Sequence, residues 1–131
     1  MAVIDASVWV AWFNDQDKFH EQADSIFLSL LLNSERISIP SLAFTEVAGV
    51  VKRTMKDNDA AWHAVYSMKL GVHKVFINTT KLDSIATEIA ISQSVRGADA
   101  YYLAVAKLTK SKLYTFDTQQ KEAFEAISQN W

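Results

Sequence analysis

The 131-residue chain contains no cysteine, one proline and three glycines. The absence of cysteine excludes disulfide bonds, thiolate metal ligands and cysteine nucleophiles. Glycine and proline are scarce and no Ser/Gly-rich or single-sign charged run occurs, so flexible linkers and low-complexity tails are not expected. Half of the residues are hydrophobic, which is enough to bury one core. A single domain over residues 1–131 is therefore predicted.

Long hydrophobic runs are also missing. The first apolar segment is interrupted by Asp5, and later apolar stretches are broken by polar residues within about ten positions. There is no basic leader before the first apolar segment. A cytoplasmic protein without a membrane segment is the resulting expectation.

Excess positive charge is absent, because the formal net charge is −2. Proteins that coat nucleic acid by bulk attraction are usually strongly basic on at least one face, so that class is disfavoured. If RNA is a substrate, local basic groups and bound cations must attract it. Arg96, Lys52 and Arg53 are candidates for RNA phosphate contacts. Solvated helix-end cations are the alternative interpretation for the lysine-containing group.

Short apolar segments alternate with stretches of helical periodicity. Strands are predicted at 2–4, 36–39, 74–77 and 112–116, and helices at about 7–13, 20–32, 41–55, 59–70, 80–90, 99–108 and 120–127. Pro40 is expected to stop the second strand, and Ser41 to cap the helix that follows. This alternation predicts an α/β fold of three layers, α/β/α, with a central, mainly parallel sheet of four or five short strands.

Two further residue groups leave their roles open. The aromatic residues Trp9, Trp12 and Phe13, with Phe19 nearby, favour a core cluster, with a face for a partner helix as the alternative. The three histidines are widely separated and show no ligand spacing, so the sequence gives no support for a zinc site.

Four carboxylates occupy suggestive positions. Asp5 and Asp117 each follow a predicted strand, and ligands of open α/β sheets collect at the carboxyl ends of the strands. Asp99 stands near the start of a helix that can direct it to the same edge. Glu46 lies inside a helix among apolar residues, where an inward glutamate needs a compensating cation or proton. Each has an ordinary alternative, as a helix-start aspartate or a solvated glutamate.

If the four carboxylates lie close together, a cation-binding site becomes the favoured interpretation. Carboxylates held together repel one another, and their proton affinities rise unless a positive group fills the gap. Magnesium prefers oxygen ligands and usually binds through one or two carboxylates, substrate phosphates and water. One or two such ions would activate a water for in-line attack on a phosphodiester. Metal-dependent hydrolysis is therefore the hypothesis.

Four segments carry a resemblance to a known family. They are Val3-Ile4-Asp5-Ala6-Ser7-Val8, Ser41-Leu42-Ala43-Phe44-Thr45-Glu46-Val47, the ten residues Gly97 to Ala106 that include Asp99, and Leu113-Tyr114-Thr115-Phe116-Asp117. In this order and spacing they resemble the PIN-domain family, specifically the VapC-type toxin nucleases of VapBC toxin–antitoxin modules. The resemblance spans essentially the whole chain and weakens near the C-terminus, where little room is left for a final strand.

The resemblance implies a Mg²⁺- or Mn²⁺-dependent endoribonuclease, a hydrolase that cuts RNA. In this family's pattern Asp5, Glu46, Asp99 and Asp117 would form the catalytic metal site, with Asp5 and Asp99 as direct ligands. Thr115 and Ser7 would orient carboxylates or water. The family further implies a homodimer and a cognate antitoxin whose segment blocks the site.

Two alternatives remain. One is a PIN-fold RNA-binding or assembly protein that has lost turnover. The other is a phosphoacceptor signalling module, which also places an aspartate at strand ends. That class would require an acidic pair after the first strand, whereas Asp5 stands alone.

Overall fold

The computed structural model describes residues 1–131 and contains one sheet of four strands. The strands are β1 (Ala2–Ile4), β2 (Ile37–Pro40), β3 (Lys74–Phe76) and β4 (Lys112–Tyr114). Their order in the sheet is β3-β2-β1-β4, and every neighbouring pair is parallel. The predicted parallel sheet is confirmed, with four strands as the observed number.

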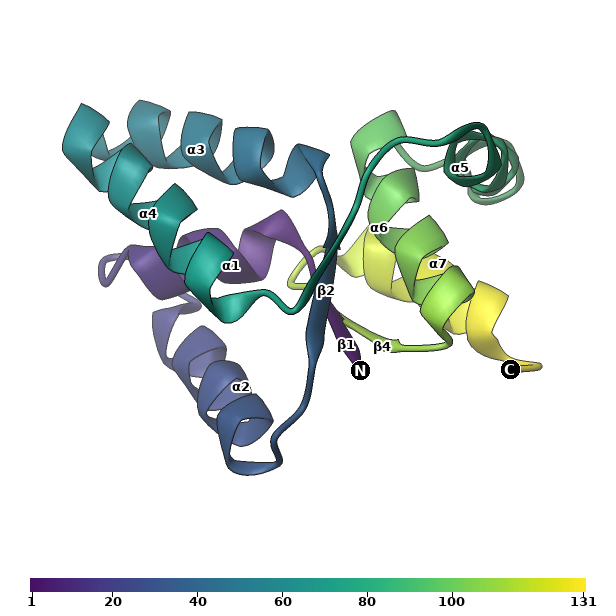
Figure 1. Ribbon diagram of the computed structural model, residues 1–131, viewed down its shortest axis with the longest axis horizontal. Coiled ribbons are helices and arrows are strands. Elements are labelled where there is room, and N and C mark those ends of the chain that lie inside the picture. The colour runs from purple at the N-terminus through teal and green to yellow at the C-terminus, as the bar shows by residue number, and fades with distance from the viewer.

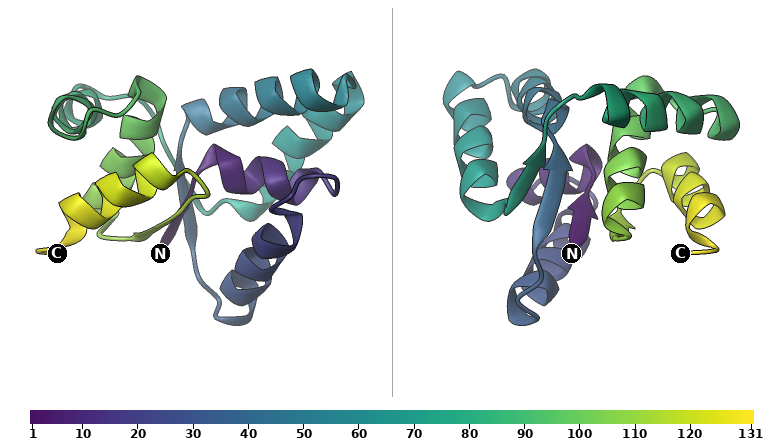
Figure 2. Two further views of the ribbon diagram at one scale, coloured as in Figure 1. Left: turned by 180° about the vertical axis from the view of Figure 1, so that it is seen from behind. Right: turned by 45° about the vertical axis from the view of Figure 1, so that its right-hand side comes forward.

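Seven helices enclose the sheet in two layers. They are α1 (Ala6–Phe13), α2 (His20–Leu32), α3 (Leu42–Met55), α4 (Asn58–Gly71), α5 (Thr80–Gln93), α6 (Gly97–Thr109) and α7 (Thr118–Ser128). Helices α1 to α4 lie on one side of the strands and α5 to α7 on the other (Figure 1). The two further views show the same separation (Figure 2). The three-layer α/β/α architecture is confirmed.

The core lies on both faces of the two central strands. All residues of β1 and β2 are buried, including Ser38, as expected for parallel strands covered by helices on both sides. Helix α6 packs against β1, β2 and β4 and buries six of its residues. On the other side, Trp9 is buried and stacks with Phe13, so the aromatic cluster around α1 belongs to the core. This packing fixes the carboxyl ends of β1 and β4 side by side.

Two strand predictions were wrong in detail. The fourth strand ends at Tyr114 instead of Phe116, because its only partner β1 ends at Ile4, which is in register with Tyr114. Pro40 does not stop the pairing of β2, since Pro40 lies in register with Phe76 and the next residue, Ser41, donates its N–H to the Phe76 carbonyl at 2.9 Å. The pairing of β2 with β3 therefore continues without a donor on Pro40, because Ser41 supplies the N–H.

Two helix predictions also need correction. Ser41 precedes α3 with helical backbone angles and makes no side-chain capping bond, so it does not cap the helix as expected. The apolar residues of the segment 20–32 recur at the three-and-four spacing that predicts a buried stripe, Leu31 among them, but Leu31 is 76% exposed, while Ala23, Phe27 and Leu30 are buried. The stripe is narrower than the three-and-four spacing predicted because α2 packs chiefly on α1.

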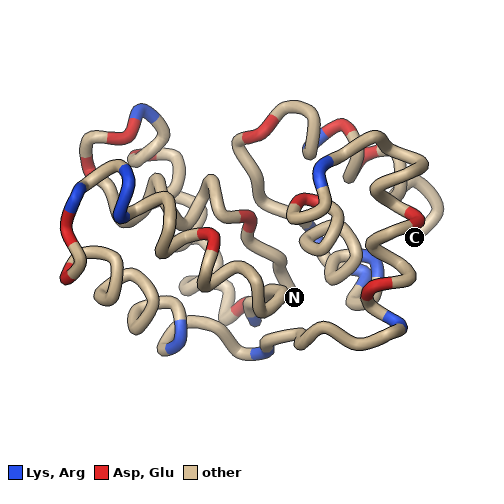
Figure 3. The backbone as a smooth tube through the Cα atoms, turned by 90° about the horizontal axis from the view of Figure 1, so that it is seen from above, with Lys and Arg blue, Asp and Glu red and all other residues tan.

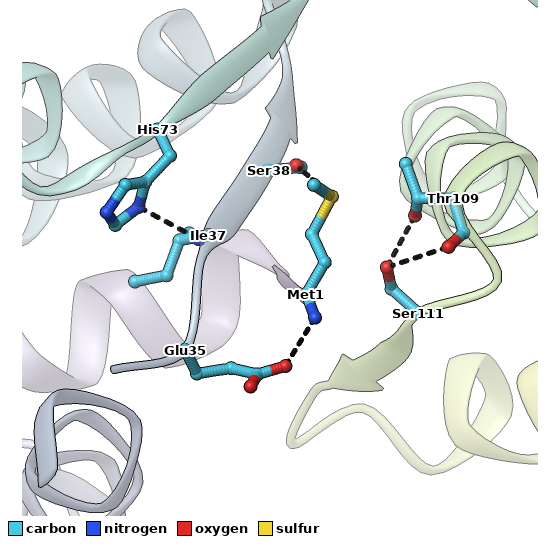
Figure 4. A network of polar contacts seen from close by, with 7 residues as sticks. All are labelled: Met1, Glu35, Ile37, Ser38, His73, Thr109 and Ser111. Atoms are coloured by element: carbon cyan, nitrogen blue, oxygen red, sulfur yellow. Dashed lines mark hydrogen bonds and ion pairs between the residues drawn. The ribbon is translucent and has the colours of Figure 1, made fainter. Parts of the chain in front are cut away.

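Polar contacts hold the amino ends of the strands together (Figure 4). The Met1 amino group pairs with Glu35, and the backbone N–H of Ile37 donates to Nδ1 of His73 at 3.1 Å. Between the end of α6 and the start of β4, the side-chain hydroxyls of Thr109 and Ser111 lie 2.6 Å apart. No helix in the structure has the length and apolar character required to span a membrane.

Candidate active site

A cavity of ≈ 400 Å³ opens at the carboxyl ends of the strands. Its lining includes all four carboxylates singled out from the sequence, together with Ser7 and Arg96. The acids reach it from four separate places: the turn after β1 for Asp5, α3 for Glu46, the first turn of α6 for Asp99 and the turn after β4 for Asp117. The fold therefore brings together residues up to 112 positions apart, as the difference between 117 and 5 shows.

Asp5 is the most enclosed member of the set, at 4% exposed. As N-cap of α1 it accepts a bond from the Ser7 N–H. The same oxygen, Oδ2, also accepts bonds from Ser7 Oγ at 2.7 Å and Thr115 Oγ1 at 2.9 Å. Burial raises the pKa of Asp5, and the Ser7 and Thr115 bonds oppose that rise. Ser7 and Thr115 thus hold the Asp5 carboxylate in place through Oδ2.

Asp117 caps α7 and is tied to the same network. Its Oδ1 accepts the N–H of Gln120 at 3.0 Å, and its own N–H donates to Thr115 Oγ1 at 3.0 Å. Gln120 is buried, and its side-chain amide donates to the backbone carbonyl of Asp99 at 3.2 Å. A chain of hydrogen bonds therefore links Asp5, Thr115, Asp117 and the backbone of α6.

Glu46 faces the cavity from α3 instead of pointing to solvent. The hydroxyl of Tyr102, on α6, donates to its Oε1 at 2.7 Å. Burial raises the pKa of Glu46, the Tyr102 bond lowers it, and the charge of Asp5 adds to the rise. Tyr102 is fully buried, and its own pKa is raised well above the usual value by burial and by the Glu46 charge.

Asp99 shows the clearest effect of crowding. Burial, followed by the charges of Asp5, Asp117 and Glu46, raises its pKa to about 6, and Arg96 opposes this rise. The neighbouring carboxylates are therefore close enough to disfavour its ionised form. A positive group placed among them would reverse that penalty.

Carboxylate oxygens are the donors that Mg²⁺ prefers, so the chemistry of the site fits a hard divalent ion. No three His, Cys, Asp or Glu side chains lie close enough together to hold an ion by themselves. Mg²⁺ usually binds proteins through one or two carboxylates and keeps several waters. The arrangement fits a partly hydrated ion of that kind.

Comparison with known proteins identifies the family. The family model of the PIN domain matches residues 2–125. The chain belongs to the PIN domain family. No curated protein matched the chain in sequence.

Solved structures share the PIN fold of this chain. VapC20 of Mycobacterium tuberculosis, described as a toxin that cleaves the sarcin–ricin loop, is 22% identical with a TM-score of 0.78, covering 94% of this chain and 95% of its own. FitAcB of Neisseria gonorrhoeae is 17% identical, with a TM-score of 0.70 and coverages of 95% and 94%. VapBC2 of Rickettsia felis, bound to a promoter DNA fragment, is 13% identical, with a TM-score of 0.69 and coverages of 92% and 90%. These likenesses establish the fold.

The three basic residues predicted to contact RNA occupy different places in the PIN domain. Arg96 lines the acidic cavity, whereas Arg53 lines an adjoining hollow that also includes Glu46. Lys52 is exposed on α3 and lines neither hollow, so the structure does not bring it to the acids. Basic and acidic positions are interspersed along the backbone in the view from above (Figure 3).

Sequence reasoning missed several residues of this PIN-domain cavity. Asp17, Phe19 and Phe116 line it, and Tyr102 and Gln120 support its acids from behind. The sequence predicted Tyr102 only as part of the helix over residues 99–108, and Gln120 only as the start of the last helix. Asp17 lies in the polar loop Asn14-Asp15-Gln16-Asp17, where nothing in the sequence separates it from Asp15. Only the position of Phe116 beside Asp117 offered a signal.

Proposed function

We propose that this PIN domain is a metal-dependent endoribonuclease that hydrolyses RNA phosphodiester bonds with Mg²⁺ or Mn²⁺ as cofactor. The observation that carries the proposal is the shared cavity of Asp5, Glu46, Asp99 and Asp117, in which burial and then the neighbouring carboxylate charges raise the pKa of Asp99 to about 6. Such clustering disfavours ionised carboxylates unless a cation joins them. If these acids served only as helix-start residues, their side chains would not need to share one cavity.

Asp5 and Asp99 are the proposed direct metal ligands. Asp5 is held by Ser7 and Thr115, and Asp99 lies in the first turn of α6, above the Gln120 bond to its backbone. When bound, Mg²⁺ or Mn²⁺ would supply the Lewis acidity that activates a water and offsets the charge developing on the phosphate.

Glu46 and Asp117 complete the site at its sides. Tyr102 keeps Glu46 turned inward, and the cap of α7 keeps Asp117 at the rim, so both carboxylates can accept protons from ordered water. Arg96 lines the cavity and is the proposed contact for a substrate phosphate, with Arg53 nearby on α3. Lys52 is the weakest of the three candidates because it lines neither hollow.

We further propose that the protein is the toxin of a toxin–antitoxin pair. Its fold matches VapC20 of M. tuberculosis and a toxin–antitoxin complex from Klebsiella pneumoniae, the latter with 16% identity and a TM-score of 0.63. Such a toxin would act in the cytoplasm as a homodimer and would be held inactive by a cognate antitoxin. Gel filtration of the purified chain tests the dimer, which a monomer at micromolar concentration would contradict.

The test of the nuclease proposal is RNA cleavage by the purified chain with Mg²⁺ or Mn²⁺ and with chelator, beside Asp5→Asn and Asp99→Asn variants. Cleavage that requires metal and falls by at least about 100-fold in both variants is expected. Metal-independent cleavage, or full activity of both variants, would reject the mechanism. RNA binding without any cleavage would instead identify a PIN domain that has lost turnover, and a phosphodonor that labels Asp5 would identify a phosphoacceptor.

A further inference from the structure

Two aromatic rings lie beside the acids in the same cavity. Phe19, from the loop before α2, and Phe116, from the loop after β4, stack with ring centroids 4.6 Å apart and an interplanar angle of 16°. Both are only half-buried, and both line the acidic cavity. We call this pair the aromatic shelf. It presents apolar surface directly next to carboxylates, and both rings also pack against the hydrophobic core.

The aromatic shelf is fixed relative to the acids by backbone hydrogen bonds. The N–H of Phe116 donates to Ser7 Oγ at 3.0 Å, and that hydroxyl donates in turn to Asp5 at 2.7 Å. The N–H of Phe19 donates to Oδ1 of Asp17, another lining residue, at 2.8 Å. The backbone of Phe116 is thereby tied to Asp5 through Ser7, and the Phe19 ring stacks on the Phe116 ring. A group resting on them would therefore be placed reproducibly against the reacting phosphate.

A cation completes the surroundings of the shelf. The Lys18 ammonium lies 5.0 Å from the centroid of the Phe19 ring, and Lys18 is exposed. A flexible lysine can leave the ring for a nearby backbone phosphate and so uncover the ring face. Aromatic side chains beside cationic groups are the recurring platform on which unpaired bases stack in proteins that bind single strands.

We propose that the aromatic shelf is a nucleobase subsite, which stacks an unpaired base next to the scissile phosphate. The inference rests on the proposed nuclease function and adds to it two residues, Phe19 and Phe116, that position the base. A base inside a duplex is already stacked on its neighbours and cannot lie on the shelf without being unpaired. A segment of a protein partner is the competing occupant.

The test uses leucine and tyrosine variants. Phe19→Leu and Phe116→Leu keep apolar packing but remove the ring face, whereas Phe19→Tyr and Phe116→Tyr keep the ring. The matched control is Tyr66→Leu on α4, an exposed residue of the separate Trp62–Tyr66 stack that does not line the cavity. Thermal unfolding and Mn²⁺ binding of each variant show whether the fold and the metal site are intact.

Cleavage of a hairpin RNA with an unpaired loop gives the first measurement. Each leucine variant should lose about 5- to 100-fold in kcat/KM, the tyrosine variants should recover most of it, and the control should not change. An abasic nucleotide beside the cleavage point should cost the wild type a similar factor but cost the leucine variants little more. Independent, multiplying losses from the abasic nucleotide and the leucine change would overturn the inference.

A binding measurement separates failure of the shelf from failure of the nuclease proposal. The Asp99→Asn chain is mixed with single-stranded RNA that contains 2-aminopurine, whose fluorescence is quenched on stacking. Quenching that disappears with Phe19→Leu supports the subsite even if the wild type cleaves no RNA. Unchanged quenching and unchanged cleavage in both leucine variants would overturn the inference and leave a protein segment as the occupant of the shelf.

Discussion

Asp5 combines two roles that are usually separate. Its carboxylate caps α1 by accepting the Ser7 N–H, and the same side chain lines the acidic cavity. The sequence offered these as competing interpretations, but the structure makes them compatible, because a residue between a strand and a helix lies at the carboxyl edge of the sheet. Three bonds to Oδ2 hold the side chain in place and do not use Oδ1.

Tyr102 provides the sharpest prediction at the scale of one residue. Tyr102→Phe removes only the hydroxyl that donates to Glu46 at 2.7 Å, in a side chain that is fully buried. A hydrogen bond to a charged group contributes about 1.5–3 kcal/mol, so kcat should fall by about 10- to 100-fold if Glu46 must stay turned inward. Steady-state cleavage kinetics measure this.

The control for Tyr102→Phe is Tyr101→Phe, which removes the hydroxyl that donates to Asp83 on the outer side of α6. That variant should keep its kcat. Equal losses in the two variants would show that the Tyr102 hydroxyl acts only through general stability of α6.

At the scale of helices, α7 is more than a cover for the sheet. Gln120 is 1% exposed and joins α7 to the Asp99 carbonyl of α6, while its own N–H holds Asp117. Gln119, its neighbour, is exposed and donates to the Ser94 carbonyl outside the cavity. The two adjacent glutamines therefore make a matched pair for mutation.

Gln120→Leu should destabilise the protein by about 0.5–1.5 kcal/mol, because the hydrogen bond from the buried Gln120 amide to the Asp99 carbonyl is lost. It should also raise the Mn²⁺ concentration that gives half-maximal cleavage, since Asp99 is then less well placed. Gln119→Leu should do neither. Urea unfolding and a metal titration of activity measure the two effects, and a Gln120→Leu chain with wild-type metal dependence would refute the positioning role.

Element positions were largely predictable, whereas their ends were not. The periodicity of α2 and α3 placed both helices correctly, because a buried stripe leaves a clear three-and-four pattern. The ends of β2 and β4 depend on which strand lies alongside, and pairing is not written in the local sequence. The candidate acids were found because each follows a strand or starts a helix, or matches the family pattern. Tyr102 and Gln120 were missed because their partners lie far away in the chain.

At the scale of the whole molecule, the acidic cavity makes stability depend on pH. The pKa of Asp99 is about 6 in the folded chain against an ordinary 3.8, and the pKa values of Asp5 and Glu46 are raised as well. The unfolded chain therefore releases these protons first as the pH rises. Stability should be greatest at the acidic end of the window between about 3.8 and 6 and should fall until Asp99 is ionised.

Thermal unfolding in chelator at pH 5 and pH 7.5 measures this dependence. The unfolding temperature should be lower at pH 7.5, and saturating Mn²⁺ should raise it again, because an ion that binds only the folded state stabilises it. Asp99→Asn should raise the unfolding temperature at pH 7.5 by about 3–6 °C and flatten the pH dependence. An unfolding temperature that rises from pH 5 to pH 7.5 in chelator would contradict the electrostatic account of the site.

Calorimetric titration of the chain with Mn²⁺ at pH 6, in two buffers of different ionisation enthalpy, tests the central claim most directly. The account predicts saturable binding whose heat differs between the buffers, because ligation displaces a proton from the carboxylates around Asp99. Binding should be weakened at least about 10-fold in Asp5→Asn and Asp99→Asn. No heat of binding, or equal binding by the wild type and both variants, would contradict it.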